Sequence, residues 1–168
     1  MASQSSFDVT TGVDYMEVHN AVDQATKEIT QRYDFKGLKV GLELQQKEKK
    51  IILTAPDEYK LKAMWDVLQS KMVRRQVPLK NLSPGKVDPA AASTVRQEIA
   101  IQDGLTADMA RDVARVIKDA KMKKVQAAIQ GDTVRISSPS KDELQAAIAL
   151  LKSQDLGVEL TFSNFRSN

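Results

Sequence analysis

Residues 51–68 read IILTAPDEYKLKAMWDVL, and residues 134–151 read VRISSPSKDELQAAIALL, so one apolar pattern recurs at an offset of 83 (134 minus 51). In each stretch a short apolar strand leads through a proline-containing turn into a helix with apolar side chains three and four residues apart. The same register aligns Leu79–Leu82 with Phe162–Phe165. A pattern written twice predicts a duplicated structural unit.

The two copies differ in length before this stretch. Matching positions of the preceding helices lie 91 residues apart, as in Val22 and Val113. The first copy therefore has 8 extra residues (91 minus 83), which we place around Arg32 to Lys39. Because this insertion occurs in only one copy of a duplicated scaffold, it is a candidate for a functional element.

Each copy is predicted to run strand, helix, strand, strand, helix, strand. The expected elements of the first copy are a strand at 7–13, a helix at 14–33, strands at 40–44 and 50–54, a second helix, and a strand near 77–82. The second helix is expected to begin within residues 54–58 and to end within residues 71–75. Those of the second copy are a strand at 95–101, a helix at 106–121, strands at 125–130 and 133–137, a helix at 140–153, and a strand at 157–165. This order is the ferredoxin-like βαββαβ plan, an α+β fold with an antiparallel sheet and both helices on one face. We predict domains at 1–83 and 94–168, joined by a linker at 84–93.

The composition excludes much catalytic chemistry. The chain has no cysteine and one histidine, His19, so thiolate metal sites and paired imidazoles are absent. Its 7 glycines form neither of the glycine-rich phosphate-binding motifs. We therefore predict a protein that is not an enzyme and has no cofactor and no metal. Without a secretory signal or an apolar run of about 20 residues, a cytoplasmic location is expected.

Aromatic residues form 5% of the chain, so their positions are informative. Phe7, Phe35, Phe162 and Phe165 lie in predicted terminal strands or in the insertion, next to or near ionisable residues. Aromatic faces beside arginine or lysine are suited to stacking bases and holding phosphates. The alternative is that these rings close the ends of two small cores.

Two further features of the sequence bear on contact with nucleic acids. The RNA-recognition motif shares this order of elements, but the predicted open positions of its third strand hold no aromatic ring here. The basic clusters Lys47–Lys50, Lys71–Arg75 and Lys121–Lys124 have the charge to contact phosphates, although such clusters are commonly solvated surface. The usual mode of the RNA-recognition motif is therefore excluded, whereas phosphate contact by the lysines stays open.

Several segments resemble the bacterial YajQ family over nearly the whole chain. They are Phe7-Asp8-Val9, residues 17–24, Arg32-Tyr33-Asp34-Phe35-Lys36, residues 128–135, Asp155-Leu156-Gly157 and Phe162-Ser163-Asn164-Phe165-Arg166. The chain departs from the family pattern at Thr10-Thr11-Gly12 and at Ser138-Pro139, where a Gly-Lys pair is common. The resemblance implies two ferredoxin-like domains that exchange strands, so that the strand at about 6–13 pairs in the other domain. It also implies nucleotide binding, with cyclic di-GMP, other purine nucleotides or RNA as ligands.

Together these observations predict a cytoplasmic nucleotide-binding protein that acts as a regulator responsive to cyclic di-GMP or another nucleotide, with no contact to membranes. An RNA- or protein-binding module without a small nucleotide ligand is the alternative. The insertion exists only in the first copy and the aromatic pair only in the second, as a single site on a duplicated scaffold would require. The predicted nucleotide-binding residues are Phe7, Arg32, Asp34, Phe35, Lys36, Phe162, Asn164, Phe165 and Arg166.

Overall fold

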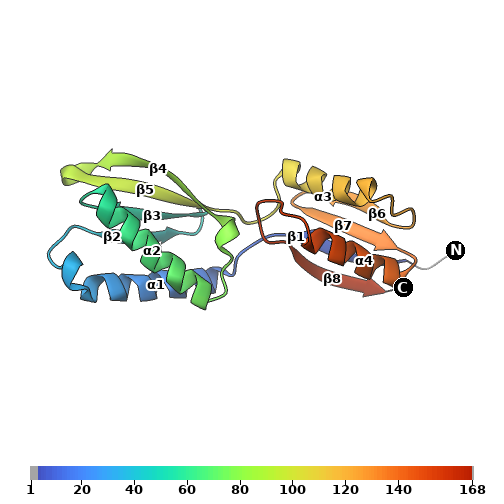
Figure 1. Cartoon of the computed structure of the whole chain (residues 1–168), viewed down its shortest axis with the longest axis horizontal. Helices are drawn as coiled ribbons and strands as arrows, with labels where there is room; N and C mark the ends of the chain where they lie inside the picture. The colour runs from blue at the N-terminus through green and yellow to red at the C-terminus, as the bar shows by residue number, and fades with distance from the viewer. Residues whose placement is uncertain (1–3, 168) are drawn as a thin grey trace. The chain divides into compact units, whose positions relative to one another are not determined.

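The computed structural model describes residues 4–167 (Figure 1). Within them, two four-stranded antiparallel sheets and four α-helices form two compact units. One unit consists of the residues up to Gly12 together with those from Asp103 onward, and we call it the discontinuous unit. The other, Val13–Gln102, is the continuous unit. The predicted α+β fold with two antiparallel ferredoxin-like sheets is confirmed.

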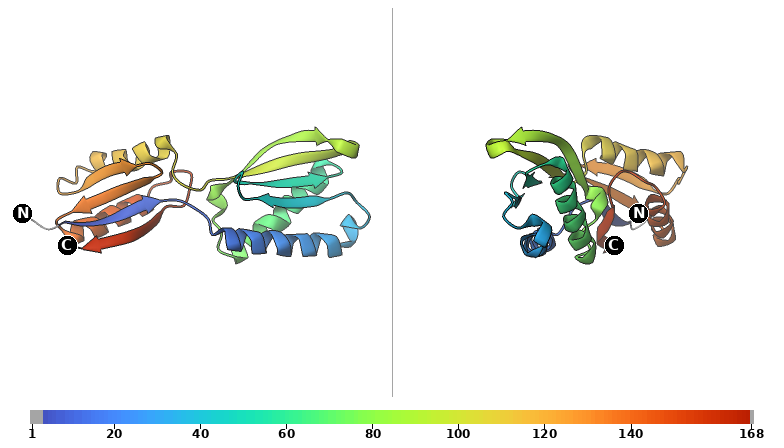
Figure 2. Two further views of the ribbon diagram at one scale, coloured as in Figure 1. Left: turned by 180° about the vertical axis from the view of Figure 1, so that it is seen from behind. Right: turned by 60° about the vertical axis from the view of Figure 1, so that its left-hand side comes forward.

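The continuous unit has the strand order β2-β3-β5-β4, with both helices on one face of the sheet (Figure 2). Its core lies between that face and the helices, and includes Ile51, Leu53 and Ile99 of the central strands and Leu61 and Leu68 of the second helix. The elements are α1 (Tyr15–Gln31), β2 (Gly41–Gln45), β3 (Lys50–Ala55), α2 (Glu58–Arg74), β4 (Leu82–Ala90) and β5 (Thr94–Ile101).

The discontinuous unit has the strand order β6-β7-β1-β8, again with both helices on one face (Figure 2). Its core includes Phe7 and Val9 of one central strand, Val134 and Ile136 of the other, and Leu151 of the last helix. The elements are β1 (Ser5–Thr10), α3 (Ala107–Asp119), β6 (Gln126–Gln130), β7 (Thr133–Ser138), α4 (Lys141–Lys152) and β8 (Thr161–Ser167).

Each helix begins at a side-chain cap, which explains where the helical pattern starts. The side chains of Asp14, Asp57, Thr106 and Ser140 accept hydrogen bonds from backbone N–H groups of the first turns of α1, α2, α3 and α4. Such caps satisfy donors that have no partner within the helix. The starts of all four helices were therefore readable from local sequence.

The first strand of each sequence repeat lies in the sheet built by the rest of the other repeat. β1 pairs with β7 and β8, whereas β5 pairs with β3 and β4. Both strands are central in their sheets. The compact units therefore do not coincide with the predicted boundaries at 83 and 94.

Residues 84–93 were predicted to be a linker, and this prediction is wrong. They form most of β4 and the 3₁₀ turn Ala91–Ser93 that leads into β5. Their composition suggested a linker because it includes Pro84, Gly85 and Pro89. β4 is an edge strand, however, and proline is tolerated there because one row of backbone groups has no strand partner.

The extra length of the first repeat is spread over three places and is not confined to residues 32–39. α1 has 17 residues and α3 has 13, although their caps Asp14 and Thr106 occupy matching positions. The connection to the next strand has nine residues (32–40) in one unit and six (120–125) in the other. The hairpin tips have four (46–49) and two (131–132). The caps lie 92 residues apart (106 minus 14). A residue of α1 therefore corresponds to the residue of α3 that is 92 positions later in the chain, and not 91 as the sequence suggested.

A bulge in β8 directs its two aromatic rings to the same face of the sheet. In a regular strand Phe162 and Phe165 would point to opposite faces, because side chains alternate. The register against β1 shifts between Ser6 and Asp8, and Asn164 has a left-handed φ of 56°. The extra residue lets both rings contact Phe7, with centroid distances of 5.9 Å and 5.8 Å.

No helix of residues 4–167 is both long and apolar enough to cross a membrane.

The continuous unit contains all its strands in one stretch, so residues 13–102 expressed alone should fold and unfold cooperatively on heating. Residues 1–83 lack the central strand β5 and most of β4, and should show no cooperative transition, because a sheet without its central strand cannot enclose the core. Circular dichroism during thermal unfolding measures both fragments. A cooperative transition in 1–83 would contradict the placement of β5.

The backbone at Asn164 gives a second prediction. Asn164→Gly and Asn164→Val both remove the amide side chain, but only valine is strained at a positive φ, because it is β-branched. We expect the valine variant to be less stable than the glycine variant by about 1–2 kcal/mol in urea unfolding. Equal stability of the two variants would show that the bulge is not needed.

Candidate functional site

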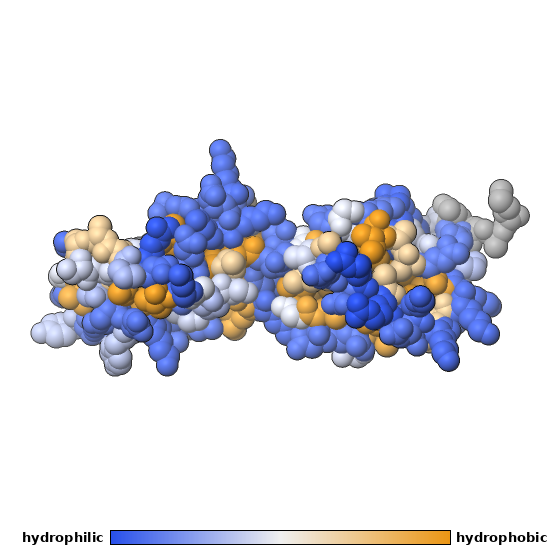
Figure 3. All heavy atoms as spheres, turned by 90° about the horizontal axis from the view of Figure 1, so that it is seen from above, coloured by the Kyte–Doolittle hydropathy of each residue, from blue (hydrophilic) through white to orange (hydrophobic). Residues whose placement is uncertain are grey.

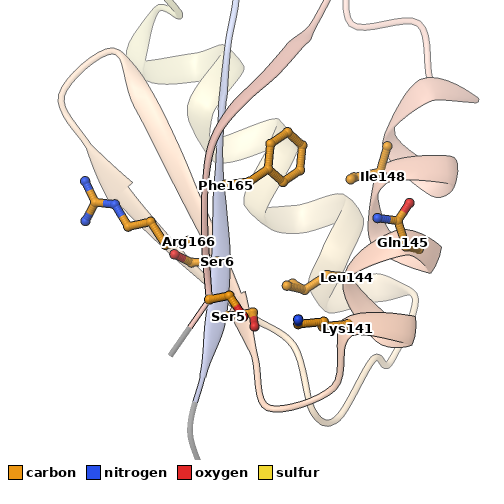
Figure 4. Close-up of a pocket in the computed structure, with 9 residues that line it drawn as sticks. Ser5, Ser6, Lys141, Leu144, Gln145, Ile148, Phe165 and Arg166 are labelled. Atoms are coloured by element: carbon orange, nitrogen blue, oxygen red, sulfur yellow. The ribbon is translucent and has the colours of Figure 1, made fainter.

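A groove opens in the discontinuous unit between α4 and the strands β1 and β8 (Figure 4). Its volume is about 220 Å³. The lining combines aliphatic, aromatic, hydroxyl and cationic groups, contributed by Ser5, Ser6, Lys141, Leu144, Gln145, Ile148, Phe165, Arg166 and Ser167. Of the residues predicted to form the site, Phe165 and Arg166 line this groove.

Phe165 forms the aromatic wall of the groove. It is 62% exposed, which is high for a phenylalanine, yet its ring rests on the fully buried ring of Phe7. In Figure 4 the Phe165 ring points toward α4, which carries Leu144 and Ile148 on the facing wall. A flat apolar group entering the groove would contact an aromatic face on one side and aliphatic side chains on the other.

Lys141 provides the positive charge on the α4 side of the groove. It is the first residue of α4, directly after the cap Ser140, and in Figure 4 its ammonium group points toward Ser5. Ser5 and Ser167, which pair across β1 and β8, add two hydroxyl groups. The groove can therefore receive an anionic group beside its apolar slot.

The Arg166 guanidinium points away from this groove, toward the opposite face of the sheet (Figure 4). On that face Asp8 accepts hydrogen bonds from Arg135 Nε at 3.0 Å and from Asn164 Nδ2 at 2.6 Å. The hydrogen bond from Arg135 is the main cause of the lowered pKa of Asp8, with smaller contributions from Asn164 and Arg166. Arg166 and Asn164 thus belong to a polar cluster behind the groove, because Asn164 lies in the bulge and Arg166 directly follows Phe165 in a strand whose side chains alternate.

Phe7 and Phe162 pack in the hydrophobic core of the discontinuous unit and do not line the groove. Phe7 has 0% exposure, so its ring offers no surface to a ligand, contrary to the expectation from sequence. Phe162 packs against the same core, with Lys152 Nζ 5.8 Å from its ring centroid. For these two rings the alternative role, closing a small core, describes the structure.

The residues predicted from the insertion lie in the continuous unit and form a local cluster. Arg32 donates two hydrogen bonds to the Asp34 carboxylate, from Nε at 3.0 Å and from Nη2 at 2.9 Å. These hydrogen bonds lower the pKa of Asp34. Phe35 is 3% exposed, with Arg32 and Lys60 lying 5.2 Å and 5.1 Å from its ring centroid. Lys36 is exposed at the end of this turn.

The two groups of predicted residues therefore belong to different units, and each has its own internal contacts. Within the continuous unit, Phe35 is buried, with two cations close to its ring, and so offers no exposed face for base stacking. The charge of Arg32 is already neutralised by Asp34. Sequence reasoning did not single out Lys141, Leu144 and Ile148 as site residues, because no motif marks them. Only the pairing of β8 with β1, which places both strands next to α4, would have indicated them.

Comparisons with known proteins agree over almost the full length of the chain. A family model described as nucleotide-binding protein YajQ-like matches residues 5–166. The chain is 50% identical over 164 residues to a protein of Solibacter usitatus named nucleotide-binding protein, covering 98% of each chain. A protein of the same name from Desulfitobacterium hafniense is 52% identical over 166 residues, covering 99% of this chain and 100% of its own. The resemblance seen in the sequence is thereby confirmed, and the chain belongs to the YajQ family.

Proposed function

We propose that this protein binds a nucleotide in the groove between β1, β8 and α4. The observation that carries the proposal is the exposed ring of Phe165, which faces Leu144 and Ile148 with Lys141 beside it. The names of its relatives, which are nucleotide-binding proteins, agree with this chemistry. A nucleotide combines a flat base with a phosphate, and the groove offers a surface for each.

The base would lie between Phe165 and the aliphatic wall of α4. Stacking on an aromatic side chain contributes about 1–3 kcal/mol per base and does not depend strongly on which base is bound. The phosphate would contact the Lys141 ammonium and accept hydrogen bonds from the Ser5 and Ser167 hydroxyls. Asp142 and Glu143 in the first turn of α4 reduce the attraction of the helix end, so Lys141 supplies most of the positive charge.

The size of the groove favours a small ligand. Its volume of about 220 Å³ is below the roughly 300–1,000 Å³ of ordinary ligand pockets. A purine mononucleotide would place its base inside and its phosphate at the opening. A cyclic dinucleotide such as cyclic di-GMP would place one base in the groove and leave the other half outside. We therefore propose a mononucleotide, and not a cyclic dinucleotide, as the preferred ligand.

We further propose that the nucleotide is bound and not converted, in keeping with a cytoplasmic regulatory role. The groove lining has no carboxylate, imidazole or thiol that would act as a nucleophile or general base. His19, the one histidine, lies on α1 beside Asp23, with 3.3 Å between Nε2 and Oδ2, in the other unit. Incubation of the protein with magnesium and labelled GTP or cyclic di-GMP should leave the nucleotide intact by chromatography, and turnover that purifies with the protein would contradict this.

Phe165→Ala and Lys141→Ala should each weaken nucleotide binding. Loss of one stacking contact corresponds to about a 5- to 150-fold increase in Kd, and loss of a charged contact falls in a similar range. Isothermal titration with GMP, AMP and cyclic di-GMP measures the affinities. Tyr33→Ala is the matched control, because Tyr33 is 89% exposed but lies in the continuous unit, far from the groove in sequence.

Unchanged affinity in both groove variants, with melting temperatures like that of the wild type, would disprove the assignment. Binding that is detected only with long RNA or with a protein partner would favour the alternative of an RNA- or protein-binding module. A Phe165→Ala variant that loses more than a few degrees of melting temperature would indicate that the ring stabilises the fold. In that case Lys141→Ala, which leaves the core untouched, decides the question.

A further inference from the structure

A second hollow lies at the opposite edge of the discontinuous unit, between the end of α3 and the edge strand β6. Its volume is about 390 Å³. The floor is aliphatic and the rim is cationic, formed by Ala114, Ile117, Lys118, Lys121, Met122, Lys123, Val125 and Ala127. It shares no residue with the groove at Phe165.

This hollow exists because α3 is one turn shorter than its counterpart. When the caps Asp14 and Thr106 are matched, the position of Ile29 corresponds to Lys121. Ile29 is 2% exposed and packs into the core of the continuous unit. Lys121 instead lies beyond the end of α3, exposed and with a left-handed φ of 54°. The missing turn leaves the aliphatic floor uncovered.

Two smaller side chains deepen the hollow. Ala114 occupies the position that Val22 has in α1. Ala127 lies opposite Ile136 in β7, just as Leu42 lies opposite Leu53 in β3. At three matched positions, therefore, one repeat fills the space with apolar side chains and the other leaves it open.

The rim carries three positive charges without a carboxylate among the lining residues. The ion pairs of α3 join Arg111 to Asp108 and Arg115 to Asp112, which leaves Lys118 outside them. Lysines that converge on a hollow raise the local concentration of anions. Figure 3 looks onto this edge of the unit and shows apolar surface lying open among hydrophilic side chains.

We infer that this hollow is a second ligand site, for an organic phosphate whose apolar body lies on the floor and whose phosphate contacts the lysines. Lysine binds phosphate as a point charge and needs no fixed geometry, which suits three exposed side chains. The inference does not depend on nucleotide binding at Phe165.

Filling the hollow is the first test. The double variant Ala114→Val with Ala127→Leu copies the residues of the other repeat, so it should keep or raise the melting temperature. The probe is the fluorescent anion 1-anilinonaphthalene-8-sulfonate, titrated into wild type, the filled variant and Phe165→Ala. We expect filling to remove most of the fluorescence gain, whereas Phe165→Ala keeps it. Equal fluorescence in a folded filled variant and in wild type would overturn the inference.

Removing the charges is the second test, and it remains decisive if the filled variant does not fold. Lys118, Lys121 and Lys123 are changed together to alanine, which should weaken probe binding roughly tenfold and reduce its dependence on salt. The matched control changes Lys39, Lys47 and Lys62, three exposed lysines of the continuous unit, and alters net charge equally. Equal weakening in both triple variants would show only a general charge effect and would overturn the site.

Competition identifies the chemistry of the ligand. AMP should displace the probe at concentrations at which inorganic phosphate does not, because only AMP brings a body for the aliphatic floor. Displacement must persist in Phe165→Ala, which separates this site from the groove. Failure of AMP to displace the probe, or equal displacement by inorganic phosphate, would overturn the assignment to an organic phosphate.

Discussion

The discontinuous unit depends on the burial of one short strand, β1. Phe7 and Val9 have no exposed surface, and the strand that carries them joins β7 to β8. Without it, the sheet would separate into the β6–β7 hairpin and a lone strand β8. The groove depends on the same strand, because the exposed ring of Phe165 rests on Phe7 and Ser5 lines the opening. Stability and the candidate site therefore share one apolar contact.

The bulge at Asn164 then divides β8 between two chemical environments. It directs Phe162 and Phe165 to the helix face, where one closes the core and the other forms a wall of the groove. It leaves Asn164 and Arg166 on the other face, near the Asp8 carboxylate. A single left-handed residue thus separates an aromatic surface from a charged one along seven residues of strand.

Sequence reasoning was reliable where structure is local and less so where it depends on distant pairing. The caps and the period of Leu61, Met64 and Leu68 define α2 without further information. The segment 84–93 was misread because its prolines lie on an edge strand, which only the sheet order reveals. Phe165, which lines the groove, was singled out in the sequence because aromatic residues are rare, whereas Lys141, which also lines it, was not, because its neighbours in space are far away in sequence. The sequence placed Phe162, Asn164, Phe165 and Arg166 in one site, because no sequence pattern reveals the left-handed conformation of Asn164 that puts both rings on one face and the two polar side chains on the other.

The central position of β1 has a consequence for synthesis on the ribosome. β1 is made before every other strand of the two units, but Val9 pairs with Val134 and Phe162, which are made far later. All the strands of the continuous unit, by contrast, are available once Gln102 has emerged. We expect that unit to fold during translation, while the apolar β1 stays unpaired until β7 and β8 have been made. Long-range pairing of this kind is slow and prone to aggregation. Newly made protein is thus most prone to aggregation after the continuous unit has folded and before β8 has been made.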